Sequence, residues 1–310
     1  MARALISPYI GCEVKTIAIR QAGKNMAKPG IRFPARILAR VRSTSKPQQA
    51  ITQTRDSLAP GMLVASYNVH KCVGADGEFN PERTSRVIRE IDADVIALQE
   101  ADKRFGEREG LLDLNRLELE TGLVPVPISG QARSHGWHGN VLLFKKGTVR
   151  DVHQVKLPGL EPRGAIVAEI DLETGSAIRI IAAHLGLLRR SRAQQTRAVL
   201  DIISSRDERP TLLLGDLNEW RLGGNSALNT LHAAFGPQPR AVPSFPSRLP
   251  LLALDRIIAN REEMLSTVTV HDTPLARVTS DHLPIKAFVN LAPKTERSDS
   301  DDSDSSRRAA

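Results

Sequence analysis

The chain has few cysteines and few aromatic residues, and each shortage narrows the class of protein. Its two cysteines, Cys12 and Cys72, exclude a disulfide framework, and neither has metal-ligand spacing. Aromatic residues make up 4% of the chain, so stacking platforms for single-stranded nucleic acid are sparse. No apolar run suits a secretory signal or a membrane span. A reducing compartment fits, as does export without disulfides; we expect a cytoplasmic protein, with peripheral attachment to a membrane as a second interpretation.

The net charge of +8 is spread unevenly. Residues 1–60 contain 11 Lys and Arg against 2 Asp and Glu, residues 61–293 are neutral overall, and residues 294–310 carry −1. We predict a basic, disordered extension over 1–60, a catalytic domain over 61–293 and a disordered Ser/Asp-rich tail over 294–310. The extension is interpreted as a solvated leader or as a weak contact for anionic surfaces. A neutral body weakens the expectation of a duplex-binding face.

Polar and ionisable side chains follow apolar strands at five places in the body. In open α/β sheets, ligands bind beyond the carboxyl ends of strands. Carboxylate and amide oxygens suit Mg²⁺, which also retains water and binds substrate phosphate. Histidines at the same ends are available for proton transfer or charge stabilisation. The five segments are Ser66–His70, Ala97–Glu100, Ala183–Leu185, Leu214–Glu219 and Ser280–Pro284.

These segments, in this order, resemble the endonuclease/exonuclease/phosphatase superfamily, which includes pancreatic-type DNases, abasic-site endonucleases, neutral sphingomyelinases and inositol polyphosphate 5-phosphatases. The resemblance covers about Met62 to Leu291, and its most specific parts are Gly215–Asn218 and Ser280–His282. It implies an α/β fold: a four-layered sandwich of two packed, mostly antiparallel β-sheets flanked by helices. The succession of predicted strands and helices favours the same layers.

Hydrophobic periodicity and turn residues predict the individual elements. Helices are expected from Pro81 and over 111–120, 190–204 and 226–235. Strands are expected over 62–69, 94–98, 140–145, 149–156, 165–172, 177–183, 211–214, 254–259, 265–271 and 284–290.

A metal site is expected around Glu100. A charge directly after a buried strand needs a partner or a metal, although a strand-end Glu can also simply reach solvent. The resemblance implies that Glu100 is the main Mg²⁺ ligand, supported by Asn68 and Asp281. Mn²⁺ is expected to substitute, and both one and two ions remain open.

Asp216 and Asn218 follow a strand two residues apart, so they face the same way in an extended chain. An Asx-turn, with both side chains bonded to backbone, explains this pair well but does not explain the surrounding set of polar residues. The resemblance implies that Asp216 orients or deprotonates the attacking water, or joins a second metal, and that Asn218 holds a phosphoryl oxygen.

Asp255 and His282 form the next expected pair. An acid after the apolar run 249–254 is costly unless it is paired, and a carboxylate fixes the tautomer of an imidazole and stabilises the imidazolium. The resemblance implies such a pair, in which His282 is either the general base or a cation that stabilises the transition state.

His184 resembles the histidine that DNases and sphingomyelinases carry as a candidate general acid, where the abasic-site branch has an asparagine-containing motif. The sequence names no carboxylate partner for His184. Arg163 and Asn140 are the candidate substrate-binding residues, together with Asn218, because a guanidinium fork suits phosphate.

We therefore expect a Mg²⁺-dependent hydrolase of phosphate esters, and a phosphodiesterase in particular, that uses an in-line water. Nucleic acid and a phospholipid or small phosphate ester are the two substrate classes. A catalytically degenerate binding protein on the same fold is the alternative. The oligomeric state is not predicted.

Overall fold

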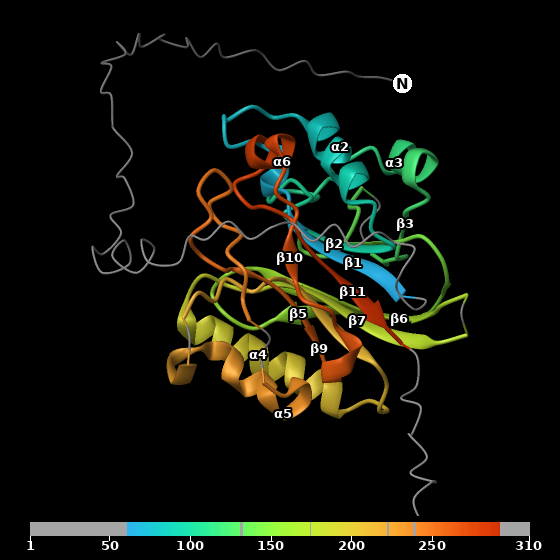
Figure 1. Cartoon of the computed structure of the whole chain (residues 1–310), viewed down its shortest axis with the longest axis vertical. Helices are drawn as coiled ribbons and strands as arrows, with labels where there is room; N and C mark the ends of the chain where they lie inside the picture. Colours follow the sequence, from blue (N-terminus) through green and yellow to red (C-terminus); the bar gives the residue numbers. More distant parts are fainter. Residues whose placement is uncertain (1–60, 131–132, 174, 222, 238–239, 292–310) are drawn as a thin grey trace, which may run out of the picture. The chain divides into compact units, whose positions relative to one another are not determined.

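Two β-sheets packed against each other form the centre of the computed structural model (Figure 1). The structure describes residues 61–130, 133–173, 175–221, 223–237 and 240–291. The predictions for residues 1–60 and 294–310, including the anionic-surface contact, lie outside these residues and stay predictions. Among the described helices, none has the length and apolarity needed to cross a membrane.

The first sheet contains six strands in the order β10-β11-β1-β2-β4-β3. Only β1 and β2 pair in parallel; the other neighbours are antiparallel. Parallel pairing brings the carboxyl ends of β1 and β2 to the same edge, where Asn68 is registered with Gln99. The strands are β1 (Gly61–Asn68), β2 (Val95–Gln99), β3 (Val124–Pro125), β4 (Val141–Phe144), β10 (Thr269–Val270) and β11 (Ile285–Asn290).

The second sheet contains five strands in the order β5-β6-β7-β8-β9. Its one parallel pair, β7 and β8, again ends at a common edge, and the remaining pairs are antiparallel. The strands are β5 (Thr148–Leu157), β6 (Arg163–Asp171), β7 (Ala177–His184), β8 (Thr211–Asp216) and β9 (Asp255–Ala259).

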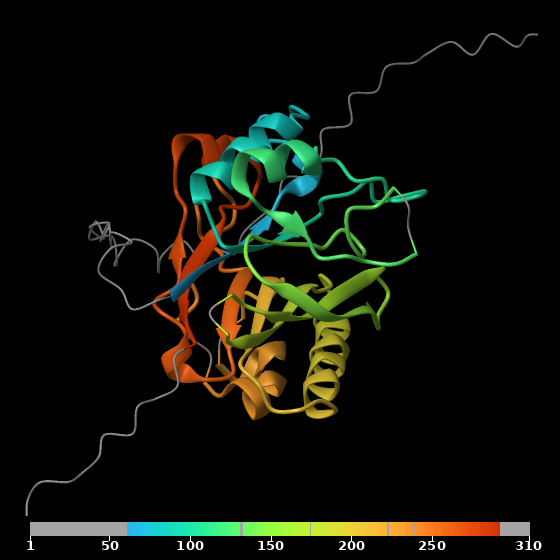
Figure 2. The ribbon, with the colours of Figure 1, turned by 90° about the vertical axis from the view of Figure 1, so that its right-hand side faces the viewer.

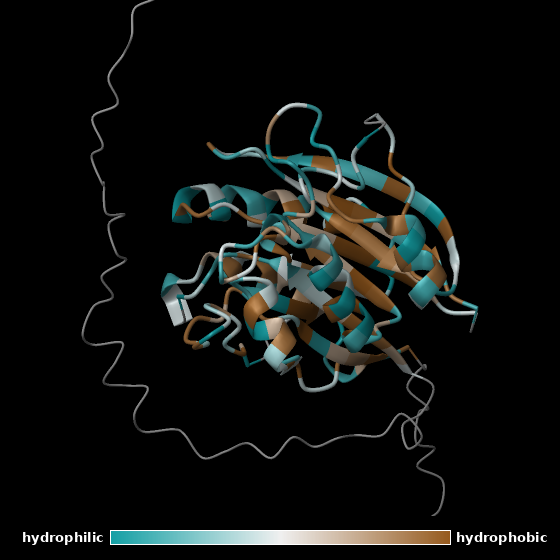
Figure 3. Ribbon diagram, turned by 90° about the horizontal axis from the view of Figure 1, so that it is seen from above, coloured by the Kyte–Doolittle hydropathy of each residue, from teal (hydrophilic) through white to brown (hydrophobic). Residues whose placement is uncertain are grey.

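Helices cover the outer face of each sheet, which completes the four layers (Figure 2). Apolar side chains from both sheets fill the space between them, and the strands are accordingly the most hydrophobic ribbons in Figure 3. A second core lies under α2, α3 and α6, and a third under α4 and α5. The predicted sandwich is confirmed. The helices are α2 (Pro81–Ile91), α3 (Leu114–Thr121), α4 (Arg189–Ser204), α5 (His232–Phe235) and α6 (Pro274–Thr279).

Local capping explains where the helices differ from their predicted bounds. The helix expected from residue 111 begins at Leu114, because the Asp113 carboxylate accepts a hydrogen bond from the Arg116 amide and caps it. It ends at Thr121, one residue beyond the predicted bound, where Gly122 with a φ of 74° forms the C-cap. The short helix α6 was not expected; Pro274 and the capping Thr273 hydroxyl start it.

Two other predictions were wrong in part. The strand expected over 265–271 is reduced to the two residues of β10 and an isolated bridge between Leu265 and Val289. The helix expected over 226–235 is a 3₁₀ turn, Ala227–Leu231, followed by the single turn of α5.

Candidate active site

Strand register places three ionisable residues in one row across the second sheet. His184 at the end of β7 is registered with Asp216 at the end of β8, and Asp216 with Asp255 at the start of β9. All three side chains are at most 2% exposed. The Asn68 amide joins this row from the first sheet by donating a hydrogen bond of 2.9 Å to Asp216 Oδ2. The two sheet edges therefore meet at one buried polar cluster.

Gly215 allows this row to form. Its φ is 150°, and a Cβ at this position would lie 1.7 Å from the Ala183 carbonyl oxygen on β7. No residue with a side chain fits so close an approach.

An Asx-turn follows the end of β8. The Asn218 backbone amide donates to Asp216 Oδ1 at 2.9 Å, which is the turn considered from the sequence. The Asn218 side-chain nitrogen donates to the Leu185 carbonyl.

Asp216 is the acceptor at the centre of the cluster. Its Oδ2 accepts the hydrogen bond from the Asn68 amide. The same oxygen lies 3.4 Å from His184 Nε2 and 3.8 Å from His282 Nε2. Two imidazoles and one carboxamide thus converge on a single carboxylate oxygen. The distance to His282 is too long for a direct hydrogen bond.

The predicted pairing of Asp255 with His282 is present. Asp255 Oδ2 lies 2.8 Å from His282 Nδ1 and also accepts the Ser244 hydroxyl at 2.5 Å. The Phe245 ring packs on the imidazole, with centroids 4.9 Å apart. Burial disfavours the charged imidazole, but the carboxylates of Asp255 and Asp216 outweigh burial and raise the pKa of His282 to about 10. His282 is therefore protonated at neutral pH.

This pair makes a pH-dependent contribution to stability. The pKa of His282 rises from 6.5 to about 10 on folding, so the contribution is complete below about pH 6.5 and is lost as the pH rises toward 10. We expect the thermal unfolding midpoint of the wild type to fall more steeply over this range than that of His282→Gln. Differential scanning calorimetry across the range makes the comparison, and parallel profiles would contradict the raised pKa.

His184 has the opposite character. Arg163 Nη1 lies 2.9 Å from His184 Nδ1, and a guanidinium only donates. The Nδ1 atom must therefore accept, which places the ring hydrogen on Nε2, facing Asp216. Burial lowers the pKa of His184 to about 3; the charge of Asp216 opposes this shift, and Arg163 reinforces it. With Nδ1 accepting, His184 can donate from Nε2, and the general-acid role expected from the sequence stays a prediction.

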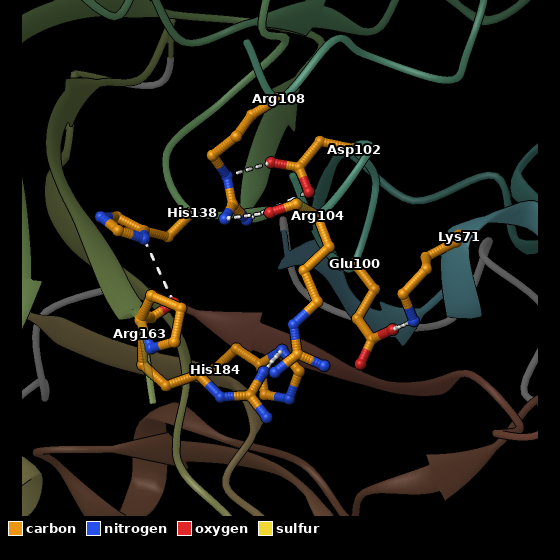
Figure 4. Close-up of a pocket in the computed structure, with 9 residues that line it drawn as sticks. Lys71, Glu100, Asp102, Arg104, Arg108, His138, Arg163 and His184 are labelled. Atoms are coloured by element: carbon orange, nitrogen blue, oxygen red, sulfur yellow. Dashed lines mark hydrogen bonds and ion pairs between the residues drawn. The ribbon is translucent and has the colours of Figure 1, made fainter. Parts of the chain in front are cut away.

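The expected metal ligands lie around the turn His70–Cys72. The His70 amide donates to Asn68 Oδ1 at 3.0 Å, His70 Nδ1 lies 3.7 Å from Asp281 Oδ1, and the Lys71 amide donates to the Glu100 carbonyl. The Lys71 ammonium contacts the Glu100 carboxylate (Figure 4). Burial alone would raise the pKa of Glu100, yet the nearby Lys71 ammonium brings it below the ordinary value, so Glu100 is ionised.

The donor chemistry at this turn fits a hard divalent cation. Glu100 and Asp281 keep 22% and 35% of their side chains exposed, and the Glu100 carboxylate is contacted by the Lys71 ammonium. Carboxylate and amide oxygens are what Mg²⁺ prefers. Among the described residues, donor atoms of Asp216, Asp255 and His282 lie within 4.8 Å of one another, and Glu100 and Asp281 are not part of this group. His282 Nδ1 in it is engaged by Asp255.

A pocket opens between Glu100 and His184, and most of its charged groups are basic (Figure 4). Arg163 reaches His184 from the start of β6 and is held by Glu161 at 3.0 Å. The lining residues are Lys71, Glu100, Asp102, Arg104, Arg108, His138, Pro162, Arg163 and His184.

Asn140 is not among the residues that line this pocket. It is fully buried, and its side-chain nitrogen donates to the Trp137 and Gly164 carbonyls. These contacts connect the starts of β4 and β6, so a role in binding substrate stays a prediction.

Sequence reasoning missed the residues that orient the site. Lys71 follows His70 directly but was not assigned a role, and Glu161 and Ser244 were also missed. Each acts on a predicted residue: Lys71 on Glu100, Glu161 on Arg163 and Ser244 on Asp255. The Glu-Pro-Arg sequence around Arg163 is a signal for the second contact. Nothing in the sequence marks Ser244, because it is brought to Asp255 by the loop before β9.

Comparison with known proteins identifies the family. The model of the Endonuclease/Exonuclease/phosphatase family matches residues 65–282, which is more than half of the chain. The chain belongs to this family, as the resemblance implied. Members of the family are in general divalent-metal-dependent hydrolases of phosphate esters.

Individual relatives agree with this assignment. The Escherichia coli K12 protein YbhP is 28% identical over 243 residues, spanning 74% of this chain and 96% of its own. The endonuclease/exonuclease/phosphatase structure from Beutenbergia cavernae has a TM-score of 0.57 at 22% identity, covering 74% of this chain and 72% of that one. The structure from Bacteroides vulgatus has a TM-score of 0.59 at 17% identity, covering 76% and 100%. The two structures show the shared fold.

Proposed function

We propose that the chain is a Mg²⁺-dependent phosphodiesterase that hydrolyses its substrate by direct attack of water on phosphorus. The observation that carries the proposal is the convergence of His184, His282 and Asn68 on Asp216 Oδ2, beside a basic pocket that also contains Glu100. Phosphoryl transfer depends chiefly on positioning and on neutralising charge, and these groups supply both.

The substrate phosphate is held from two sides. Arg163 presents a guanidinium at the pocket, fixed by Glu161, and Asn218 offers an amide hydrogen. Glu100, with Asn68 and Asp281, would hold Mg²⁺, which supplies Lewis-acid polarisation of the phosphate and stabilises the leaving oxygen.

The attacking water is oriented by Asp216 and His282. Asp216 Oδ2 and His282 Nε2 lie 3.8 Å apart, so a water oxygen located to one side of both atoms would donate to the carboxylate and accept from the imidazolium. Because Asp255 keeps His282 protonated, we assign His282 to stabilisation of charge in the transition state and Asp216 to reception of the water proton. No Ser or Cys nucleophile is required.

The role of His184 can be tested with two leaving groups. A neutral His184 hydrogen-bonds to oxygen without transferring a proton to the leaving group, so we expect His184→Gln to lower kcat about equally for a nitrophenyl ester and an alkyl phosphodiester. Steady-state kinetics on both esters give the ratio. A general acid would show a much smaller loss on the nitrophenyl ester, since nitrophenolate needs little protonation, and that result would support the role expected from the sequence.

A substrate panel tests the function as a whole. The full chain is assayed with Mg²⁺, with Mn²⁺ and with EDTA on plasmid DNA, abasic duplex, RNA, cardiolipin, sphingomyelin, inositol phosphates and bis-nitrophenyl phosphate. We expect metal-dependent turnover of at least one natural diester. Binding without turnover across the panel would instead support the degenerate binding protein.

A further inference from the structure

Four large apolar side chains are exposed on three loops that begin or end close to the site. Leu160 is 85% exposed, Leu187 66%, Leu188 50% and Trp220 47%. Leu160 precedes Arg163 by three residues, Leu187 follows His184 by three, and Trp220 follows Asp216 by four. We call these four residues the apolar rim. Single exposed apolar residues are common on soluble proteins, but grouped ones mark interaction sites.

Hydrogen bonds join the three loops into one surface. The Leu187 amide donates to Glu161 Oε1 at 2.7 Å, and the other Glu161 oxygen holds Arg163. Arg192, from the first turn of α4, donates to the Leu187 carbonyl at 2.6 Å and contacts Glu219 at 3.4 Å, next to Trp220. The rim loops therefore share Glu161 with the candidate site, where it holds Arg163.

The exposed charges on these loops are positive. Arg189 and Arg190 are exposed at the start of α4, and the Arg221 guanidinium lies 4.6 Å from the centre of the Trp220 ring. The two acids of the same loops are drawn inward: Glu161 is 17% exposed and Glu219 is fully buried. Apolar side chains and arginines are thus what these loops present to a partner.

We propose that the apolar rim docks on an anionic phospholipid bilayer, so that the site takes its phosphate ester from the membrane surface. Leucine side chains enter the boundary between head groups and acyl chains, and nearby arginines are attracted to anionic lipid. Single-stranded nucleic acid is favoured less, because three of the four rim residues are leucines, which offer no ring for a base to stack on. The choice of substrate rests on the proposed function, whereas docking itself does not.

Vesicle binding by the full chain tests the docking surface. Sedimentation is measured with vesicles of phosphatidylcholine alone and of phosphatidylcholine mixed with phosphatidylglycerol, for the wild type and for Leu187→Ser/Leu188→Ser. Serine is favoured at the N-cap position that Leu188 occupies in α4, and thermal melting confirms that the variant is folded. The matched control is Leu119→Ser, which removes a leucine that is 88% exposed on α3.

We expect the wild type and Leu119→Ser to bind the anionic vesicles equally. The double variant should bind about 100-fold more weakly, since burying one leucine is worth about tenfold or more in an equilibrium constant. Arg190→Gln should weaken binding about fivefold on anionic vesicles only.

Two results of the vesicle experiment would overturn the proposal: equal binding by the double variant and the wild type, or no binding by the wild type. So would loss of single-stranded DNA binding in the double variant with vesicle binding unchanged. Because this readout needs no turnover, an inactive protein that docks would refute only the proposed function.

Discussion

Glu100→Gln is expected to lower kcat/KM for a soluble phosphodiester about 1000-fold at saturating Mg²⁺, a loss of about 4 kcal/mol of transition-state stabilisation. The exchange keeps the shape of the side chain but removes the charge that faces the pocket and Lys71. A neutral amide is a far weaker ligand for a hard divalent cation. The measurement is steady-state kinetics as a function of Mg²⁺ concentration.

The control for this variant is Glu118→Gln, which removes a carboxylate exposed on α3 and should leave kcat/KM unchanged. The thermal midpoint of Glu100→Gln should stay near that of the wild type, because a partly exposed group at a strand end contributes little packing. Wild-type kinetics in Glu100→Gln would remove Glu100 from the metal site.

Asp255→Asn is expected to lower kcat about 10²–10³-fold, the range typical of losing a donor that stabilises charge in the transition state. Without the carboxylate, the Nδ1 contact at 2.8 Å no longer favours the imidazolium, so the pKa of His282 falls and the neutral ring no longer stabilises the transition state. The loss should be similar on nitrophenyl and alkyl esters, because it affects the attack and not the leaving group. Initial rates on both esters measure it.

A surface pair in the same chain provides the matched control. Asp151 Oδ2 lies 2.6 Å from His153 Nε2, with 42% and 49% of the side chains exposed. Exposed pairs of this kind contribute little, so Asp151→Asn should retain full kcat. If Asp255→Asn were as active as Asp151→Asn, the pair of Asp255 and His282 would have no part in the reaction.

Many residues of the candidate site could be predicted because the sequence indicates where strands end. Glu100, Asp216 and His184 each follow an apolar run that ends in a polar residue, and parallel pairing of neighbouring strands brings such ends to one edge. Asp255 was found for a different reason: a buried acid needs a partner, and His282 is that partner.

The properties that the sequence did not reveal depend on distances between remote residues. The proximity of Asp216 to His184 depends on the register of β7 with β8. The neutral state of His184 depends on Arg163, which lies 21 residues away and donates to the ring from β6. In the same way, the strand expected over 265–271 was mostly lost because only Thr269 and Val270 pair with β11 as a strand, while Leu265 forms an isolated bridge to it.

The most direct test of the account is the metal dependence of turnover by the full chain. The protein is stripped with EDTA, and hydrolysis of bis-nitrophenyl phosphate is followed as Mg²⁺ is restored, in parallel with Glu100→Gln. The account predicts that the stripped wild type is inactive, that Mg²⁺ restores its activity, and that Glu100→Gln stays inactive at the same concentrations. Full turnover by the wild type in the presence of the chelator would contradict it.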